Sequence, residues 1–228
     1  MESLKNKDDK DAKLEKLEKL FDSQIKTLEE RVGPGGVLRE LRTYKRDVCL
    51  KASQMSIPEG HIPFIPVVLQ YSILDFLMPM VWNGNKKGKT NWIRKEDIQN
   101  IVFDSYEDKR PYVCHPYYIF DVEDGKALRG QSPSIAEYVI AQNQRSPLTV
   151  TEIISLCIHS DVLSRHFVYA IGSNCGRWYI IPEIHLGENG VPILGSVHSD
   201  FSCDNWGSPS CGSRISLEFW PKFGHPLI

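Results

Sequence analysis

The sequence predicts an α+β fold: a largely antiparallel sheet with packed helices, preceded by an N-terminal helical segment. Three observations support this class. Apolar residues recur at helical spacing near the N-terminus, β-branched and aromatic runs between turn residues fill much of the rest, and two helices with readable starts lie among those runs. At 228 residues the chain can bury one substantial core. We therefore expect a charged tail and helical hairpin over 1–57 and a single α+β domain over 58–228.

The N-terminal segment starts with alternating Lys and Asp, a composition that is expected to fray. A helix is then predicted by one apolar stripe, formed by Leu14, Leu17, Phe21, Ile25, Leu28 and Val32. Gly33 to Gly36, which include Pro34, should end it, and a second helix resumes over 37–51. The stripe must be buried against the domain or against a second subunit, so a homodimer through this segment is one prediction.

The main domain begins after the turn at Pro58 to His61, where the composition changes to strand formers. Runs over 62–70 and 76–82 predict strands, and turn residues over 83–88 predict a hairpin with a basic tip before the next run, 90–94. A further strand is predicted over 117–122, closed by an Asp-Gly turn.

Two capped helices and a meander complete the domain. Ser132 before a proline begins the first helix, and Thr149 with Glu152 forms a capping box for the second, whose apolar face includes Cys157. Pro182 and Pro192 indicate edge strands or bulges. The predicted strands of the antiparallel meander and of the chain's end are 167–171, 177–186, 191–197 and 215–220.

Composition excludes several classes of function. The net charge of -2 gives no global field that would attract nucleic acid, and no apolar run is long enough for a membrane helix. The charged N-terminus is unlike a secretory signal, so a cytoplasmic protein with free thiols is expected. Three lysines at the predicted hairpin tip could touch nucleic acid, but a solvated turn is favoured. No motif predicts a cofactor.

One segment near the C-terminus, 206–214, is the main site candidate. Small residues let backbone amides converge on an anion, hydroxyls add donors, and an arginine can clamp a carboxylate or phosphate. The predicted ligand-binding residues of this loop are Trp206, Ser208, Ser210, Cys211, Gly212, Ser213 and Arg214. The alternative is a tight surface loop in which the tryptophan packs beneath and Arg214 forms a salt bridge.

Asp161 and Arg177 are further candidates. If the capped helix continues, its apolar stripe places Asp161 on the buried side, where Arg165, Arg177 or Arg214 would have to pair with it. Such a pair could line a pocket or brace the fold, and bracing is favoured. His-Ser-Asp occurs twice, at 159–161 and 198–200, but on a helix the first pair would lie about 200° apart, so no metal site is predicted.

The order of several short motifs resembles that of a bacterial protein family classed as a domain of unknown function. The resemblance covers about 58–216 and includes Asp121 in the 117–125 segment. Its main motifs are Ser146-Pro147-Leu148-Thr149 with Glu152, Leu156 and His159, then Gly172-Ser173, Arg177-Trp178, Pro182, Pro192 to Gly195, Trp206-Gly207-Ser208 and Gly212-Ser213-Arg214. The resemblance implies a soluble bacterial protein, small residues at the positions of Ser210 and Cys211, and no recurring metal ligands. It implies no activity.

Three functions follow as hypotheses. The first is a binding or regulatory module for a small anionic ligand at Ser208 to Arg214. The second is a hydrolase or transferase that uses Cys211 or the His159/Asp161 region, although no single histidine is indicated as its base. The third is a structural or interaction protein that acts through its N-terminal helices.

Overall fold

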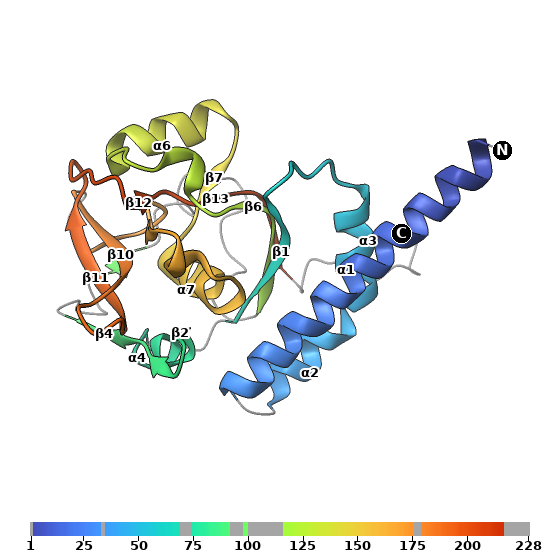
Figure 1. Cartoon of the computed structure of the whole chain (residues 1–228), viewed down its shortest axis with the longest axis horizontal. Helices are drawn as coiled ribbons and strands as arrows, with labels where there is room; N and C mark the ends of the chain where they lie inside the picture. Colours follow the sequence, from blue (N-terminus) through green and yellow to red (C-terminus); the bar gives the residue numbers. More distant parts are fainter. Residues whose placement is uncertain are drawn as a thin grey trace, which may run out of the picture.

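The computed structural model describes residues 2–32, 35–68, 74–91, 98–99, 116–175 and 179–216. Helices and mainly antiparallel sheets make up this part, so the α+β prediction is confirmed (Figure 1). The first sheet has the strand order β1-β6-β13-β7, and all its pairings are antiparallel. Its strands are β1 (Ile62–Val67), β6 (Tyr117–Glu123), β7 (Ser146–Pro147) and β13 (Ser210–Ser216).

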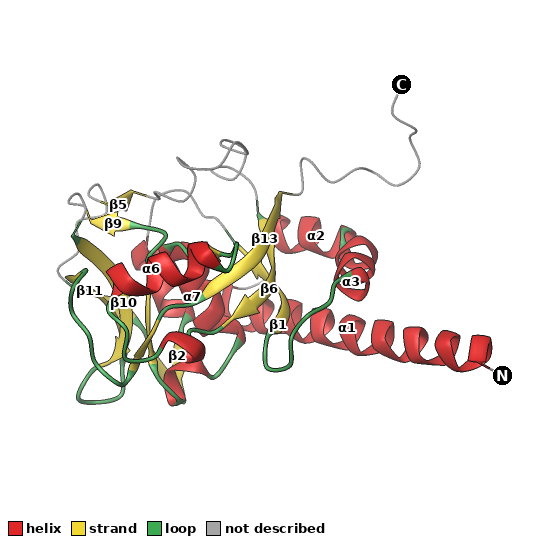
Figure 2. Ribbon diagram, turned by 90° about the horizontal axis from the view of Figure 1, so that it is seen from above, coloured by secondary structure: helices red, strands yellow, loops and turns green. Residues whose placement is uncertain are grey.

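This first sheet lies between two helical layers (Figures 1 and 2). One face is covered by α1 (Glu2–Val32), α2 (Gly36–Thr43) and α3 (Lys45–Gln54), and the other by α7 (Val150–His159). Successive side chains of β6 point to opposite layers. The Tyr118 hydroxyl donates to the Leu41 carbonyl of α2 at 3.4 Å, whereas the Tyr117 hydroxyl donates to Glu152 of α7 at 2.8 Å.

The apolar stripe of α1 is buried within the chain itself. Leu17, Phe21, Ile25 and Leu28 are all buried, and they share one core with the first sheet. The Phe21 ring stacks on Tyr118 of β6 with centroids 6.1 Å apart. Of the two ways to cover the stripe, the domain and a second subunit, the structure therefore uses the domain.

Two details of the N-terminal segment differ from expectation. The charged start belongs to the helix, since α1 already begins at Glu2; extending a formed helix costs little, and Lys is a good helix former. The predicted fraying of this start stays a prediction. The second helix is divided at Tyr44, whose amide donates to the Leu41 carbonyl at 3.2 Å and ends α2. Among the described helices, long α1 included, none is apolar enough over a sufficient length to cross a membrane.

The second sheet has the order β12-β8-β10-β11-β4, with the predicted antiparallel meander at its centre. Pro182 lies in the central strand β10 and not at an edge; its carbonyl still accepts a hydrogen bond from Ala170 at 2.8 Å. The strands of this second sheet are β4 (Lys89–Thr90), β8 (Phe167–Tyr169), β10 (Ile180–Leu186), β11 (Pro192–His198) and β12 (Trp206–Gly207). Helix α6 (Pro133–Gln142) packs on it through Ala136 and Ile140.

The run predicted as a strand over 76–82 is mostly helical. Helix α4 (Leu74–Leu77) leads into the turn η1 (Met78–Met80), where Pro79 lacks the amide hydrogen that a paired strand needs. A hairpin is present but is shorter than predicted: β2 (Trp82–Asn83) pairs with β3 (Lys86–Lys87) inside the expected turn, while Thr90 pairs with β11 in the second sheet. The Asn83 side-chain amide donates to the Gly190 carbonyl at 2.8 Å. The remaining short elements are β5 (Ile98–Gln99), β9 (Asn174–Cys175), η4 (Lys126–Leu128) and η5 (Val162–Ser164).

The largest correction concerns the C-terminal segment. Residues 210–214, predicted as part of a loop, belong to β13, which starts five positions before the expected strand at 215. The register pairs Ser213 with Phe120 and Arg214 with Ile119 of β6, and Cys211 also with Ser146 of β7. Pairing with β6 along the strand, and with β7 at Ser210 and Cys211, engages the backbone of this stretch, so tertiary context overrides its loop-like composition. Residues 217–220 of the expected strand lie outside the described part.

Candidate functional site

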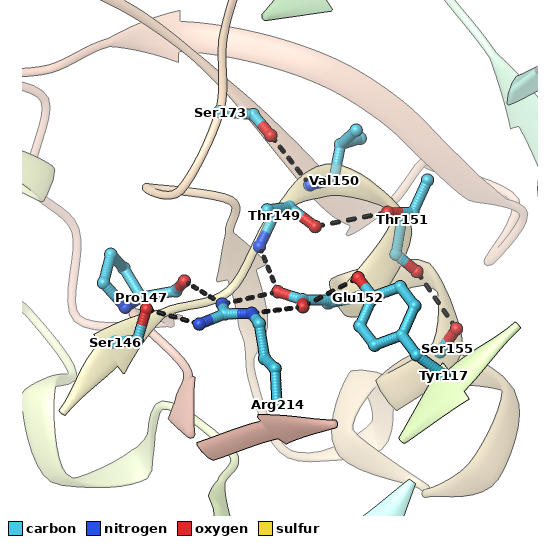
Figure 3. A network of polar contacts seen from close by, with 10 residues as sticks. All are labelled: Tyr117, Ser146, Pro147, Thr149, Val150, Thr151, Glu152, Ser155, Ser173 and Arg214. Carbon is cyan, nitrogen blue, oxygen red and sulfur yellow. Dashed lines mark hydrogen bonds and ion pairs between the residues drawn. The ribbon is translucent and has the colours of Figure 1, made fainter. Parts of the chain in front are cut away.

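Arg214, the clamp of the predicted ligand loop, points into the protein (Figure 3). Its guanidinium binds the Glu152 carboxylate in bidentate fashion, with Nε donating to Oε1 at 2.6 Å and Nη2 donating to Oε2 at 2.8 Å. Nη1 also donates to the Ser146 hydroxyl, and Nη2 to the Pro147 carbonyl at 2.8 Å. These are the contacts that the packing alternative predicted, a salt bridge within the fold.

Glu152 accepts this arginine from the first turn of α7, where it is fully buried. The Thr149 amide donates to its Oε2 at 2.8 Å, which completes the predicted capping box, and the Tyr117 hydroxyl donates to its Oε1. Burial alone would raise the pKa of the Glu152 carboxyl, but Arg214 and these hydrogen bonds lower it below its usual value. We call Tyr117, Ser146, Thr149, Glu152 and Arg214 the Glu152 network.

The other residues of the predicted loop do not converge, because successive residues of a strand face opposite sides of the sheet. Trp206 stacks on Tyr169 with ring centroids 5.0 Å apart. Cys211 is buried, which raises the pKa of its thiol to about 12, so it carries no thiolate at neutral pH. The hydroxyls of Ser208 and Ser213 are buried without a hydrogen-bond partner in the described part. Ligand binding by these residues stays a prediction.

Ser210 and Gly212 belong to a second polar cluster. Arg145 Nη1 lies 2.5 Å from Asp121 Oδ2, its Nε donates to Ser210 Oγ at 2.9 Å, and His61 Nδ1 lies 2.6 Å from Asp121 Oδ1. Asp121 has a φ of 52°, in the left-handed region. A Cβ at position 212 would stand 2.8 Å from Asp121 Oδ2, so Gly212 makes room for this carboxylate. Sequence reasoning named Asp121 only through the family resemblance.

Asp161 is not buried as the helical stripe predicted. Helix α7 ends at His159, and Ser160 follows in an extended conformation, so Asp161 leaves the helix and its side chain is 77% exposed. Its Oδ1 lies 2.9 Å from Arg165 Nη2, one of the three predicted partners. Arg177 lies outside the described residues. Across the residues that the structure describes, no group of three His, Cys, Asp or Glu side chains could hold a metal ion.

The carboxyl end of α7 borders a pocket of about 450 Å³, within the size range of small-molecule sites. We call it the α1–α7 pocket. It lies where the last turns of α1 and α7 meet the β2–β3 hairpin, and its lining residues are Thr27, Arg31, Trp82, Asn83, Gly84, Cys157 to Asp161, Leu163 and Ser164. In Figure 1 this is the lower-left end of α1, opposite the N-terminus and toward the element labelled β2.

His159 is the most unusual residue of this pocket. Both ring nitrogens are buried, and neither has a hydrogen-bond partner in the described part of the chain. Burial, helped by the charge of Arg31, lowers the pKa of His159 to about 3, so the ring is neutral at neutral pH. A neutral imidazole offers one donor and one acceptor, and leaving such groups unsatisfied costs about 1–3 kcal/mol.

Arg31 lies in the last turn of α1 and gives the pocket its cation. Its Nη1 donates to the Met80 carbonyl at 2.7 Å, and its guanidinium stands 5.3 Å from the centroid of the Trp82 ring. Partial burial lowers the pKa of Arg31, although a guanidinium still stays charged at neutral pH. The contact with Met80 uses one of the five N–H donors, so Arg31 retains donors for a ligand.

Sequence reasoning missed Arg31 and Trp82 and considered His159 only for metal binding or catalysis. In sequence, Arg31 is a basic residue in the last turn of a helix, and Trp82 is an aromatic before a turn. Neither pattern indicates that the two side chains meet. The available signal was His159 itself, a polar residue one position after the apolar face of α7, whose burial needs a partner.

The comparison with protein families agrees with the resemblance inferred from the motifs. A model of a family of unknown function (DUF5701) matches residues 36–178, more than half of the chain. The match begins before position 58, so it takes in α2 and α3, and it ends before the Trp206 to Arg214 segment. No curated protein and no solved structure matches the chain. The chain therefore belongs to this family of unknown function, DUF5701.

Proposed function

We propose that the protein binds a small ligand through an anionic group in the α1–α7 pocket. The sequence pointed to an anion site at Ser208 to Arg214. The proposal keeps the ligand class and moves the site, because the Arg214 guanidinium is engaged by Glu152, Ser146 and Pro147.

One observation carries this proposal: among the described residues, the two buried ring nitrogens of His159 have no hydrogen-bond partner, and His159 lines the same pocket as an arginine that retains donors. Arginine recognises carboxylates and phosphates by charge and by its fork of N–H groups. Because both ring nitrogens are closed to solvent, the neutral His159 ring has to turn toward the pocket before it can add one hydrogen bond, and this bond adds no charge. Trp82 supplies an apolar wall beside the arginine.

The two other hypotheses receive less support. The buried thiol of Cys211, with a pKa near 12, is a poor nucleophile, and Asp161 pairs with Arg165 at the surface. Interaction through α1 loses its main argument because the stripe is already covered by the sheet. A homodimer stays a prediction that a mass measurement in solution would check.

Thermal unfolding of the full chain tests the proposal. The probes are acetate, lactate, succinate and inorganic phosphate at neutral pH and constant ionic strength. A probe at about 50 times its Kd adds about 2 kcal/mol, and for a domain of this size that raises Tm by about 4–8 °C. We expect at least one probe to produce this shift in the wild type and none in Arg31→Gln.

Arg42→Gln is the matched control. Arg42 lies in α2 and contacts Glu29 at the surface, away from the α1–α7 pocket. It should therefore keep the wild-type response. The proposal fails if no probe stabilises the wild type, or if Arg31→Gln responds as the wild type does.

A further inference from the structure

We infer that the ligand of the α1–α7 pocket is a zwitterion, a free amino acid or a close derivative, which places its carboxylate at Arg31 and its ammonium group at the carboxyl end of α7. This inference rests on the proposed function and adds the chemical class of the ligand. It follows from how charge is distributed over the walls of the pocket.

The wall contributed by α7 is electronegative. Residues Cys157 to Ser160, the last turn of the helix and its cap, line the pocket. The last carbonyls of a helix lack intrahelical donors and carry partial negative charge. The Ser160 hydroxyl donates to the Leu156 carbonyl at 2.7 Å, and the carbonyls after it belong to the last turn, which in general lacks intrahelical donors. Asp161 follows directly and adds a carboxylate to the same wall.

The wall contributed by α1 is cationic. Arg31 is the charged side chain that α1 brings to the pocket, and Thr27 lies one turn before it. Arg31 and Asp161 are engaged separately, since Arg31 donates to Met80 and Asp161 pairs with Arg165. Arg31 and Asp161 thus do not neutralise each other, and Arg165 neutralises Asp161 only in part because its guanidinium also pairs with Asp124 at 2.7 Å.

This arrangement selects among small ions. A dianion such as a dicarboxylate would bind Arg31 with one end, but its other carboxylate would be repelled by the electronegative carbonyl wall. A simple amine would be attracted by the carbonyl wall but repelled by the positive charge of Arg31. An amino acid matches both walls, and its side chain can lie on Trp82, beside Leu163. The neutral imidazole of His159 fits the same ligand once its ring turns toward the pocket, because it can then accept from the ammonium group or donate to the carboxylate.

The experiment uses the full-length chain and the common L-amino acids as probes. Thermal unfolding first ranks them, and calorimetry then compares the strongest with its two matched analogues, one lacking the amino group and one lacking the carboxylate. For phenylalanine these are 3-phenylpropionate and 2-phenylethylamine. We expect the amino acid to bind about 5-fold more tightly than its des-amino analogue, the upper end of the range for one exposed ion pair, and the amine not to bind.

Two variants assign the groups. Asp161→Asn should lower the affinity for the amino acid by about 3-fold and leave the affinity for the des-amino analogue unchanged, because the substitution removes part of the ammonium site. Asp200→Asn, at another exposed aspartate, is the matched control and should bind as the wild type. Arg31→Gln should abolish binding of both carboxylates.

The outcomes separate this inference from the proposed function. Equal affinity for the amino acid and its des-amino analogue overturns the zwitterion and leaves the anion site standing. If no amino acid stabilises the protein while acetate, lactate or succinate does, the zwitterion is likewise overturned. If Arg31→Gln binds the amino acid as the wild type does, the proposed site itself is wrong.

Discussion

The two ends of helix α7 treat buried polar groups in opposite ways. At its amino end, Glu152 and Arg214 satisfy each other within a network that also holds the Thr149 amide. At its carboxyl end, the two ring nitrogens of His159 are buried and have no hydrogen-bond partner in the part of the chain that the structure describes, and Arg31 retains donors. Groups that are engaged inside the fold cannot recognise a ligand without unfolding part of it. The contrast therefore assigns stability to the first end and recognition to the second.

The largest expected effect is at the amino end. Arg214→Met leaves the Glu152 carboxylate buried without its guanidinium, and breaking a buried pair in this way costs about 3–5 kcal/mol. Urea unfolding measures the loss. The double variant Glu152→Leu with Arg214→Met should recover much of it, because no buried charge remains. A loss below about 1 kcal/mol in the single variant would contradict the bracing role.

The second expected effect is a pH dependence at the carboxyl end. The folded pKa of His159, about 3, lies below its unfolded value, so the unfolded state binds a proton first as the pH falls. Stability is then fully present above about pH 6.5 and declines toward pH 3 by about 1.4 kcal/mol per pH unit. In His159→Gln this contribution is absent, and the wild type should lose about 2 kcal/mol more than the variant by about pH 5. Parallel stability curves for the two proteins would contradict the burial of a neutral His159.

A smaller effect on stability is expected for the polar cluster around Asp121. This cluster is engaged like the Glu152 network but is less buried. Its partners Arg145 and His61 are partly exposed, so water compensates for part of any lost contact. Asp121→Asn keeps a side chain that tolerates the left-handed conformation but removes the charge. We expect a loss of about 1 kcal/mol in urea unfolding. A loss as large as that of Arg214→Met would place this cluster with the Glu152 network.

A similarly small effect on stability is expected for Arg31. Arg31→Gln removes the hydrogen bond to Met80 and the contact with Trp82, together worth about 1 kcal/mol. The paired comparison of Arg31→Gln with Arg214→Met sharpens the contrast between the ends of α7. An Arg31 variant that unfolds as readily as the Arg214 variant would show that both arginines are braces.

Local sequence signals predicted the elements that depend on local physics. The capping box of Thr149 and Glu152, the start of α6 after Ser132 and the strand 117–122 are all present. Two failures in the sheets share one cause, which is tertiary context. Pro182 lies in a central strand, and Ser210 to Arg214 form a paired strand, because neighbouring strands satisfy backbone groups that composition alone assigns to edges or loops.

The site could be predicted only in part for the same reason. An anion site needs a cation and unpartnered polar groups in one place, and the sequence offered several arginines without their partners. Arg214 lies in the more unusual segment, yet the fold directs it to Glu152, whereas Arg31 reaches His159 only because α1 docks beside α7. A histidine that follows an apolar helical face was the residue-level signal, since burial of such a ring requires a partner.

The central claim, that His159 takes part in ligand recognition, is tested most directly by nitrogen NMR of the histidine rings. The full chain with 15N-labelled histidine is titrated with the probe that gives the largest thermal shift, and His159→Gln assigns the signal. The account predicts a neutral imidazole pattern for His159 at neutral pH and a change in its ring-nitrogen shifts at saturation, while exposed His198 stays unchanged. Saturation of the protein without any change at His159 would contradict it.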